Sequence, residues 1–499
     1  MNFKSLAITL FCFLIASLEI FSNAPIILRH ADELIGQSDE MTNTRTLRGN
    51  VRLQQNNVYV TCDSAIQYLN TNKFLLIGNV VIKQETLTLK SHSVLYDGNS
   101  YLAKADNAVH ITDKSNKLVG KRGTYSTNLM IANFYDEVIL EDDSVKIFAN
   151  FITYNRETSD SKAIGDVTVQ SKNQNIFLQA DTINNFPNSK RTIARGNPVL
   201  FQIDTIWQNN PKPEFPNIDS LALDTSTVDS FAVDFAVDIS NVDTLAAAFT
   251  LDTLSIKSDT MFAFREAENE HYIFIGNVEF VKKELKAKSA QSIYYVADEK
   301  IILYSSVLQS EDIRDFDTVD SATVENFNTV ENKAENFNTA MKINEQAIVW
   351  LDSTQLHSDS IVVKLEDSKL KNIYAFNNCI AISLTDTINL SRIDQLAGNE
   401  IILHIENDTL RKIESIGNAR SVFFSESNDE PDGVIEATAE KIIIMLEDGK
   451  AENIYLIKQI PGKYHPEPFV RGIEKNFYLP NFKKSDDIPI RPEIRNFIQ

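Results

Sequence analysis

A short segment that begins with glycine and asparagine returns at a nearly fixed interval along the first part of the chain. It reads Gly49-Asn50-Val51-Arg52-Leu53 at its first occurrence. Related segments start at Gly78, Asp106, Tyr135, Gly165 and Gly196, so each follows the last by 28 to 31 residues. A fixed period of this length is typical of stacked architectures in which no single unit buries its own apolar face. We therefore expect the function to come from the stack, and we expect no single catalytic centre.

Each copy carries the alternation that is typical of a half-buried β-strand. The opening pair is followed by an alternating apolar run, a short polar turn such as Asn56-Asn57, and a second alternating run such as Val58 to Cys62. Period-two alternation places one face inward and the other toward water. A small or polar corner such as Asp63-Ser64-Ala65 then follows, where the chain bends into the next layer. The pattern predicts an all-β fold, a solenoid-like stack of bent antiparallel strands, in which the Gly-Asn pair is the turn that launches each strand.

The organisation of the chain changes at proline-rich and low-complexity segments. Three prolines between 211 and 216 end the first block, and aspartate then recurs roughly every five residues. The repeat resumes at Leu251, and a second low-complexity stretch holds the duplicated pentapeptides Glu325–Thr329 and Glu335–Thr339. We predict a signal or anchor segment (1–24), a first block (25–207), an acidic low-complexity linker (208–250), the first part of a second block (251–310), a low-complexity insertion (311–343), degenerate repeats of the second block (344–460) and a proline-rich extended tail (461–499).

The N-terminal segment has the pattern of a secretory signal. Lys4 precedes an apolar run from Leu6 to Leu18, and Ser22-Asn23-Ala24 forms a small-x-small site. Pro25 is a poor context for cleavage after Ala24, so an N-terminal anchor that is not cleaved is the alternative. In either case we expect an exported protein.

Charge and cysteine content exclude several classes of protein. The chain has 48 Lys and Arg against 69 Asp and Glu, a formal net charge of -21, which repels a phosphate backbone and argues against nucleic-acid binding. An exported chain with only Cys62 and Cys379 beyond the signal segment is not a disulfide scaffold. Cys379 takes the position that Val51 and Val80 hold in their copies, so we expect it to be a small buried hydrophobic residue.

Motifs for chemistry are missing from the sequence. Its seven histidines form no His-x-x-His or His-x-His pair, and it contains no phosphate-binding loop, no Gly-x-Ser-x-Gly elbow and no calcium-loop spacing. We therefore predict no catalytic residue, no metal site and no cofactor. A β-helical carbohydrate-active enzyme remains an alternative, because its paired carboxylates would be far apart in the sequence.

The candidate functional residues are the first apolar positions after each opening pair. They are Val51, Leu53, Val80, Ile82, Val109, Ile111, Val138, Leu140, Val167 and Val169. In a stack of bent strands these positions form apolar columns on the inward face. The columns are either a closed, dry core or the lining of an open groove long enough for acyl chains, and the spacing alone leaves both possibilities open. Arg52, Lys83 and Lys90 alternate with the columns, and we interpret them as solvated outward positions.

The order of these patterns resembles a known family. Four segments carry the resemblance: Ala31-Asp32-Glu33-Leu34, Leu47-Arg48-Gly49-Asn50-Val51, Cys62-Asp63-Ser64-Ala65 and Leu76-Ile77-Gly78-Asn79-Val80. Together with the period of about thirty residues and the signal segment, they resemble the organic-solvent-tolerance family, the OstA/LptA-like periplasmic proteins of lipopolysaccharide transport. The resemblance is good from Arg29 to Ile206, fair from Leu251 to Ser305 and thin up to Ile460. The long form with two blocks and a proline-rich tail resembles versions from Bacteroidetes.

The resemblance implies a fold and a function for both blocks. It implies a β-jellyroll of V-shaped strands whose open interior takes the acyl chains of lipid A, while sugar and phosphates stay outside. It also implies a periplasmic location, other lipopolysaccharide-transport proteins of the inner and outer membranes as partners, and head-to-tail self-association. It favours the groove over the closed core. This chain departs from a minimal bridge protein in its length and its insertions, which puts lipid binding by the second block in doubt.

We therefore expect an exported, non-enzymatic lipopolysaccharide carrier, free in the periplasm or held at the membrane by its N-terminal segment. A lipid with several acyl chains loses about 0.8 kcal/mol for each methylene exposed to water, so it needs a shielded path across an aqueous compartment. The alternatives are a structural or adhesive β-stack of the cell envelope and, less favoured, the carbohydrate-active enzyme.

Overall fold

The fold is built from β-strands. The computed structural model describes residues 24–38, 43–172, 174–207, 249–266, 270–307, 346–384, 389–427, 430–447, 449–458 and 461–494. Thirty strands and two 3₁₀-helices account for the regular structure of these residues, which confirms the all-β prediction. No helix in this part of the chain is long and apolar enough to cross a membrane. Residues 1–23 of the predicted signal segment, almost all of the predicted linker and the whole of the predicted insertion lie outside the described residues.

The chain divides into two compact units, each of which is described by itself. Unit 1 comprises Met1–Asn173 and Asp181–Ser189, and unit 2 comprises Gln174–Ala180 and Lys190–Gln499. The division falls inside β14 (Ile176–Phe186), which is earlier in the chain than the block boundary predicted at 207. The finer division into seven segments stays a prediction.

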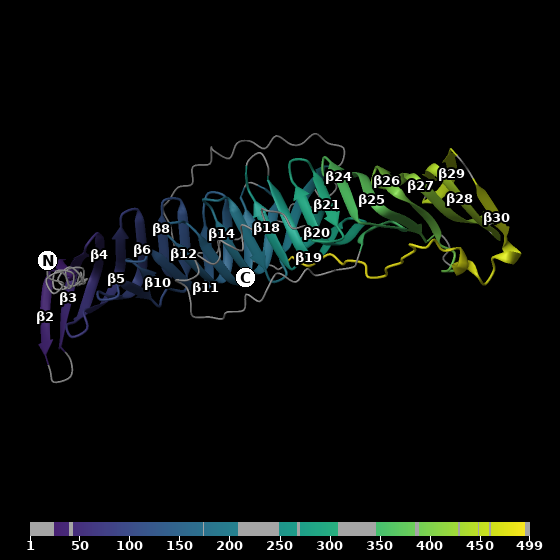
Figure 1. The fold of residues 1–499 in the computed structure, drawn as a ribbon. Helices are drawn as coiled ribbons and strands as arrows, with labels where there is room; N and C mark the ends of the chain where they lie inside the picture. The colour runs from purple at the N-terminus through teal and green to yellow at the C-terminus, as the bar shows by residue number, and fades with distance from the viewer. Residues whose placement is uncertain are drawn as a thin grey trace, which may run out of the picture. The chain divides into compact units, whose positions relative to one another are not determined.

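Unit 1 is a succession of antiparallel strands, drawn in purple and blue in Figure 1. Its strands are β1 (Ile27–His30), β2 (Glu33–Ser38), β3 (Asn43–Gln55), β4 (Val58–Tyr68), β5 (Lys73–Gln84), β6 (Leu87–Asp97), β7 (Leu102–Ala105), β8 (Val109–Asp113), β9 (Asn116–Gly120), β10 (Arg122–Ser126), β11 (Ile131–Glu141), β12 (Val145–Asn155), β13 (Ser161–Ser171) and part of β14. Consecutive long strands pair along their whole length, as β3 does with β4 and β4 with β5.

The long strands are bent in the middle by a bulge. The register of β3 against β4 shifts between Arg48 and Val51, where Gly49 has φ 75° and Asn50 has φ 48°. Glycine and asparagine tolerate this left-handed conformation better than other residues, and two such residues in a row bend the strand. The prediction that the Gly-Asn pair is a turn between strands is therefore wrong, because the pair lies inside a strand, at the point of a V.

The two arms of the bent strands belong to two layers. The arm of β3 before its bulge pairs with β2, and the arm after it pairs with β1. In the same way β6 pairs with β7 through one arm and β8 through the other, and β11 pairs with β10 and β9. We call the arms that join β2, β7 and β10 layer A, and the arms that join β1, β8 and β9 layer B. This arrangement is the stack of V-shaped strands that the resemblance implies.

Unit 2 continues the same plan. Its strands are part of β14, then β15 (Arg191–Arg195), β16 (Val199–Trp207), β17 (Phe249–Lys257), β18 (Thr260–Phe264), β19 (His271–Lys282), β20 (Leu285–Tyr295), β21 (Lys300–Tyr304), β22 (Ala347–Leu351), β23 (Thr354–Ser358), β24 (Ser360–Glu366), β25 (Lys369–Ser383), β26 (Asp394–Glu406), β27 (Thr409–Ser427), β28 (Glu430–Glu447), β29 (Lys450–Ile457) and β30 (Gly462–Pro466). Bulges recur at Gly276-Asn277, Asn377-Asn378 and Gly417-Asn418. Cys379 follows the second of these and is fully buried, which confirms its predicted role as a small hydrophobic residue.

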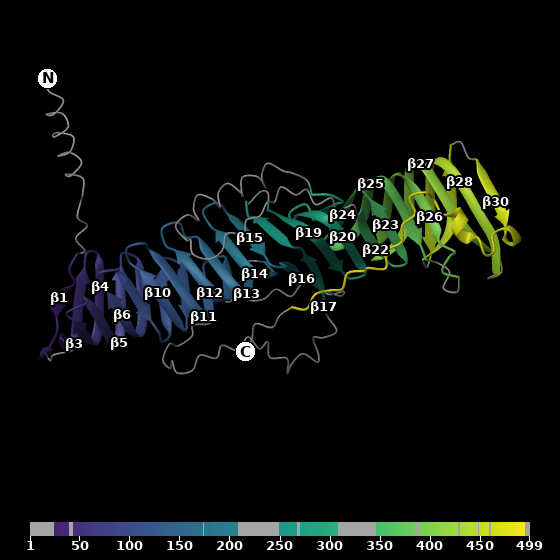
Figure 2. The same ribbon diagram turned by 60° about the horizontal axis from the view of Figure 1, so that its bottom comes forward.

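Part of the outward face of unit 2 is apolar and is covered by the C-terminal segment. Ile380 and Ile382 alternate with the inward-facing Cys379 and Ala381 and yet are 0% and 1% exposed. Tyr478, Leu479 and Phe482 pack against this pair, and Val470 packs against a second cluster on β27 and β28. We call residues 467–494 the strap. Figures 1 and 2 both show it in yellow, running back along strands that precede it in the chain.

Side chains, and not a strand ladder, hold the strap in place. The Gln355 amide donates to the carbonyl of Ser485 (2.8 Å) and accepts from the amide of the same residue (3.0 Å). Gln395 accepts from the amide of Leu479 at 2.8 Å. The sequence predicts an extended tail; the structure places β30 and the 3₁₀-helices Glu467–Phe469 and Glu474–Phe477 there, followed by residues 478–494 without a strand or helix.

The hydrogen bonds of Gln355 predict how a variant behaves under protease. We expect Gln355→Ala to increase the rate of tryptic cleavage at Lys483 and Lys484 several-fold, because it removes two hydrogen bonds worth about 1 kcal/mol each. The exposed Gln170→Ala on β13 is the matched control and should leave cleavage unchanged. Equal cleavage rates in all three proteins would show that these bonds do not hold the strap.

A carboxylate on the outer face of unit 2 predicts acid sensitivity. Burial raises the pKa of Glu414, but hydrogen bonds from Lys412 (2.6 Å) and Lys441 (2.5 Å) outweigh it and lower the pKa from 4.5 to about 2. Because the folded pKa is the lower one, the stabilisation is present above pH 4.5 and is lost as the pH falls toward 2. We expect Glu414→Gln to flatten the fall of the thermal midpoint in this window, measured by calorimetry. The exposed Glu452→Gln is the matched control. If both variants change the slope of the thermal midpoint against pH by the same amount, Glu414 is not the source of the acid sensitivity.

Candidate functional site

The candidate residues lie in layer B and face the interior of unit 1. Nine of them are buried, with at most 6% exposure: Val51, Leu53, Val80, Ile82, Val109, Ile111, Val138, Leu140 and Val167. Val169 is half-buried. The structure thus brings the ten residues onto one wall, one pair from every second strand of the layer, namely β3, β5, β8, β11 and β13. The alternating Arg52, Lys83 and Lys90 are exposed on the other face, as predicted.

The facing wall comes from layer A, and the sequence analysis missed it. Phe74, Tyr96, Tyr125 and Phe134 are its largest side chains, and each is at most 2% exposed. A signal for this wall was present, because Phe74 precedes Gly78 by four positions, in mirror image of Ile82. A bend that separates two layers places apolar residues inward on both sides of the bulge.

The interior is closed at these positions. Side chains that are almost fully buried on both walls pack against each other, as in an ordinary protein core. Acyl chains can occupy this space only if the two layers move apart or if side chains rearrange. Occupation of the interior by lipid therefore stays a proposal.

The points of four of the V-shaped bends are fixed by a repeated polar contact. Asn50 donates to Asp32, Asn79 to Asp63 and Asn277 to Asp259, each at 2.9 Å, and Asn378 donates to Asp359 at 2.7 Å. Asp63 lies within β4, and the other three aspartates lie in the short breaks between two consecutive strands. In the first three contacts the aspartate covers the glycine that precedes the asparagine. A Cβ on Gly78 would overlap the carboxylate of Asp63, so that position requires glycine for space as well as for its φ of 75°.

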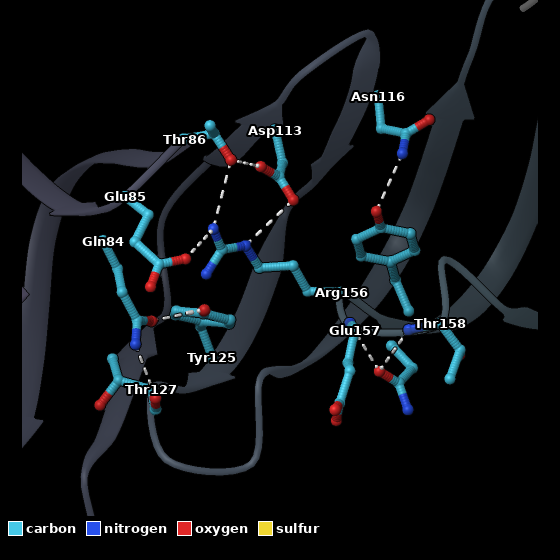
Figure 3. A network of polar contacts seen from close by, with 12 residues as sticks. Gln84, Glu85, Thr86, Asp113, Asn116, Tyr125, Thr127, Arg156, Glu157 and Thr158 are labelled. Carbon is cyan, nitrogen blue, oxygen red and sulfur yellow. Dashed lines mark hydrogen bonds and ion pairs between the residues drawn. The ribbon is translucent and has the colours of Figure 1, made fainter.

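The opposite side of unit 1, where the arms of the V end, is closed by side-chain hydrogen bonds between the layers. Tyr96 of layer A donates its hydroxyl to Gln55 of layer B (2.5 Å), and the Gln55 amide donates to the carbonyl of Gly98 (2.9 Å). One repeat later, Tyr125 donates to Gln84 (2.7 Å) and Gln84 donates to the carbonyl of Thr127 (2.9 Å). Figure 3 shows this second pair. We call each such connection a rung.

The third rung is charged. Asp113 of layer B accepts from Arg156 at 3.1 Å and from the hydroxyl of Thr86 at 2.5 Å, and Arg156 also reaches Glu85 at 3.0 Å (Figure 3). The side chains of Asp113 and Arg156 are 3% and 7% exposed. Nη1 of Arg156 is buried and has no hydrogen-bond partner among the described residues. Burial raises the pKa of the neighbouring Tyr125 to about 12, so its hydroxyl stays a donor.

The rungs follow the repeat. Gln55, Gln84 and Asp113 are spaced by 29 residues, and so are Tyr96 and Tyr125. A glutamine that recurs at the repeat interval at the end of an apolar run was the signal that could have identified them. Polar side chains at such buried positions are stable only when they are hydrogen-bonded, and here they bond to the other layer.

Two further features concern binding. Within the described ranges no group of three or more His, Cys, Asp or Glu residues could hold a metal ion. In unit 2 a cavity of ≈ 350 Å³ is lined by apolar residues that include Leu410, Ile413 and Phe423 and by acidic residues that include Asp352 and Asp408.

Fold and interior define a class: an all-β stack of V-shaped strands that encloses an apolar space between two layers. The comparison with protein families then gives a match to part of the chain. Residues 23–181 match the family described as OstA-like protein, which confirms the resemblance over these residues.

Solved structures and curated proteins add little to this assignment. The crystal structure of LptH, described as the LptA homologous periplasmic component of the conserved lipopolysaccharide transport device from Pseudomonas aeruginosa, is 16% identical and covers 23% of this chain and 83% of that chain, with a TM-score of 0.21. A TM-score this low carries no argument about the fold or function of this chain. The comparison with curated proteins found no match.

Proposed function

We propose that the protein is a periplasmic lipopolysaccharide-binding transport protein that shields the acyl chains of lipid A between its two layers during transfer to the outer membrane. The observation that carries the proposal is the two-walled apolar interior of unit 1, to which every strand of layer B from β3 onward contributes buried apolar residues. The OstA-like match over residues 23–181 supports it.

The physical requirement for such a carrier is continuity. Each methylene that leaves water contributes about 0.8 kcal/mol, so an acyl chain moves without a large barrier only if one apolar contact replaces another along its path. Leu53 of β3, Val60 of β4 and Ile82 of β5 are buried and pair across consecutive hydrogen-bonded strands of layer B, so each step between them is close to the ~4.8 Å between strands. A column with such short steps is suited to passing a chain from strand to strand.

Edge strands provide surfaces for partners. β1 and β2 of unit 1 carry the exposed apolar residues Ile27, Leu28, Leu34 and Ile35. In unit 2 the edge strand β29 exposes Tyr455 together with its neighbours Ile454 and Ile457. Exposed apolar edges pair readily with strands of other chains. We propose that these edge strands bind other lipopolysaccharide-transport proteins of the two membranes, or a second copy of this chain in head-to-tail order. We also propose that the protein is exported through the signal in residues 1–24.

Photocrosslinking in intact cells tests the function. A photoreactive residue at Val80 or Ile111 should capture labelled lipopolysaccharide, while one at the outward-facing Arg52 or Lys83 should give only background. If the inward and outward positions give equal signals, the carrier function is wrong. A structural or adhesive β-stack, or a carbohydrate-active enzyme, predicts that outcome.

A further inference from the structure

The rungs lie where the V-shaped strands of unit 1 would have to open. At the point of each V the two layers are continuous through the backbone and are fixed by contacts such as Asp63 with Asn79. At the other end Gln55 is the last residue of an arm in layer B, and Tyr96 is near the end of an arm in layer A. No backbone pairing joins the layers through these two residues, whose strand partners lie within their own layers. Any sideways opening of the interior must therefore break the rungs and leave the points of the V intact.

We propose that the rungs Gln55–Tyr96, Gln84–Tyr125 and Asp113–Arg156 form a latch that controls how fast acyl chains enter the interior of unit 1 from the side. The proposal rests on the lipid-carrier function and assigns the place and the control of lipid access. The points of the V act as hinges and the rungs as the part that opens.

The chemistry of the rungs suits a closure that opens reversibly. Aliphatic side chains at Gln55 and Gln84 would join the two walls by burying more apolar area, and separating them would expose that area to water. A hydrogen-bonded amide and phenol exchange their partner for water when the layers part, so each bond contributes little net free energy to closure. For the charged rung, opening returns Asp113 and Arg156 to water and so recovers the desolvation cost of a buried ion pair. The latch thus keeps the layers closed without making the closure permanent.

A variant of the full-length protein that lacks two latch bonds tests the proposal. Tyr96→Phe with Tyr125→Phe keeps both buried rings and removes both hydroxyl hydrogen bonds to glutamine. Tyr59→Phe with Tyr68→Phe is the matched control, because these two tyrosines are exposed on strand β4. Each protein carries a photoreactive residue at Val80, and the rate of capture of labelled lipopolysaccharide is followed. We expect capture to be about fivefold faster for each bond removed and unchanged in the control.

A locked variant tests the same latch in the opposite direction. The Gln84 amide and the Thr127 carbonyl are 2.9 Å apart across the two layers, so Gln84→Cys with Thr127→Cys places two thiols on opposite sides of the opening. Cys62 and Cys379 are buried, and burial raises the pKa of both thiols, so the wild-type protein treated with the same short, reducible thiol cross-linker is the control. We expect the cross-linked protein to capture lipid at least tenfold more slowly and reduction of the link to restore the rate.

The outcomes separate the latch from the carrier function. If the phenylalanine pair captures lipid at the wild-type rate, or the linked protein captures it as fast as the reduced one, the latch is wrong while the carrier function stands. If the wild-type protein captures no lipopolysaccharide at Val80, the carrier function fails and the latch fails with it.

Discussion

Replacing Gly78 with alanine is expected to destabilise the strands around it by about 3 kcal/mol. The left-handed conformation costs a residue with a Cβ roughly 1–2 kcal/mol, and the new methyl group also overlaps the Asp63 carboxylate. Because a chain of this size does not unfold in one step, amide hydrogen exchange of β4 and β5 is the suitable measurement. Gly36→Ala is the matched control, since no heavy atom lies within 4 Å of a Cβ at that position.

A second substitution separates the two causes. Asp63→Ala removes the carboxylate that the new methyl group would meet, so in the Asp63→Ala background the cost of Gly78→Ala should fall by about 1–2 kcal/mol. What remains is the strain of the backbone and the close contact with the Cβ of residue 63, which alanine keeps. If the cost is the same in both backgrounds, the overlap with the carboxylate of Asp63 contributes nothing to the requirement for glycine.

Arg156→Met is expected to have an effect of similar or larger size, about 3–5 kcal/mol. It leaves the buried carboxylate of Asp113 without its cationic partner, and an uncompensated buried charge is far more costly than the loss of a pair. Hydrogen exchange of the backbone amides of β8 and β12 measures this loss of stability.

The double variant tests the reason for this cost. Arg156→Met combined with Asp113→Leu replaces the pair by apolar groups of similar volume, and we expect it to recover most of the stability that Arg156→Met loses. If the two single effects simply add, the ion pair is not what stabilises this part of unit 1.

The sequence was sufficient to predict one wall of the interior. The Gly-Asn pair fixes the register of each copy, and period-two alternation then places Val80 and Ile82 inward with no further information. The same reasoning misplaced the pair itself. A Gly-Asn sequence usually marks a turn between strands, and only the pairing of β3 with β4 on both sides of Gly49 shows that it bends a single strand.

The latch and the strap could not be predicted because both depend on contacts between distant segments. Gln84 at the end of an apolar run is an ordinary strand terminus until Tyr125 is placed beside it. The unbroken apolar run around Ile380 is a signal for burial on both faces that the sequence analysis did not use. Nothing local, however, identifies Phe482 as the residue that covers it, about a hundred positions later in the chain.

The position of the strap has a consequence for biosynthesis. Residues 467–494 follow every strand that they cover, so a ribosome or a translocation channel releases the apolar outer face of β22, β23 and β25–β28 before the segment that buries it. Unit 1 needs no such late segment, because the outward positions of its repeats, such as Arg52 and Lys83, are polar. During synthesis the apolar outer face of unit 2 is therefore exposed for an interval in which a chaperone that binds apolar β-surfaces can bind it. A chain that ends before residue 467 would leave this face exposed permanently.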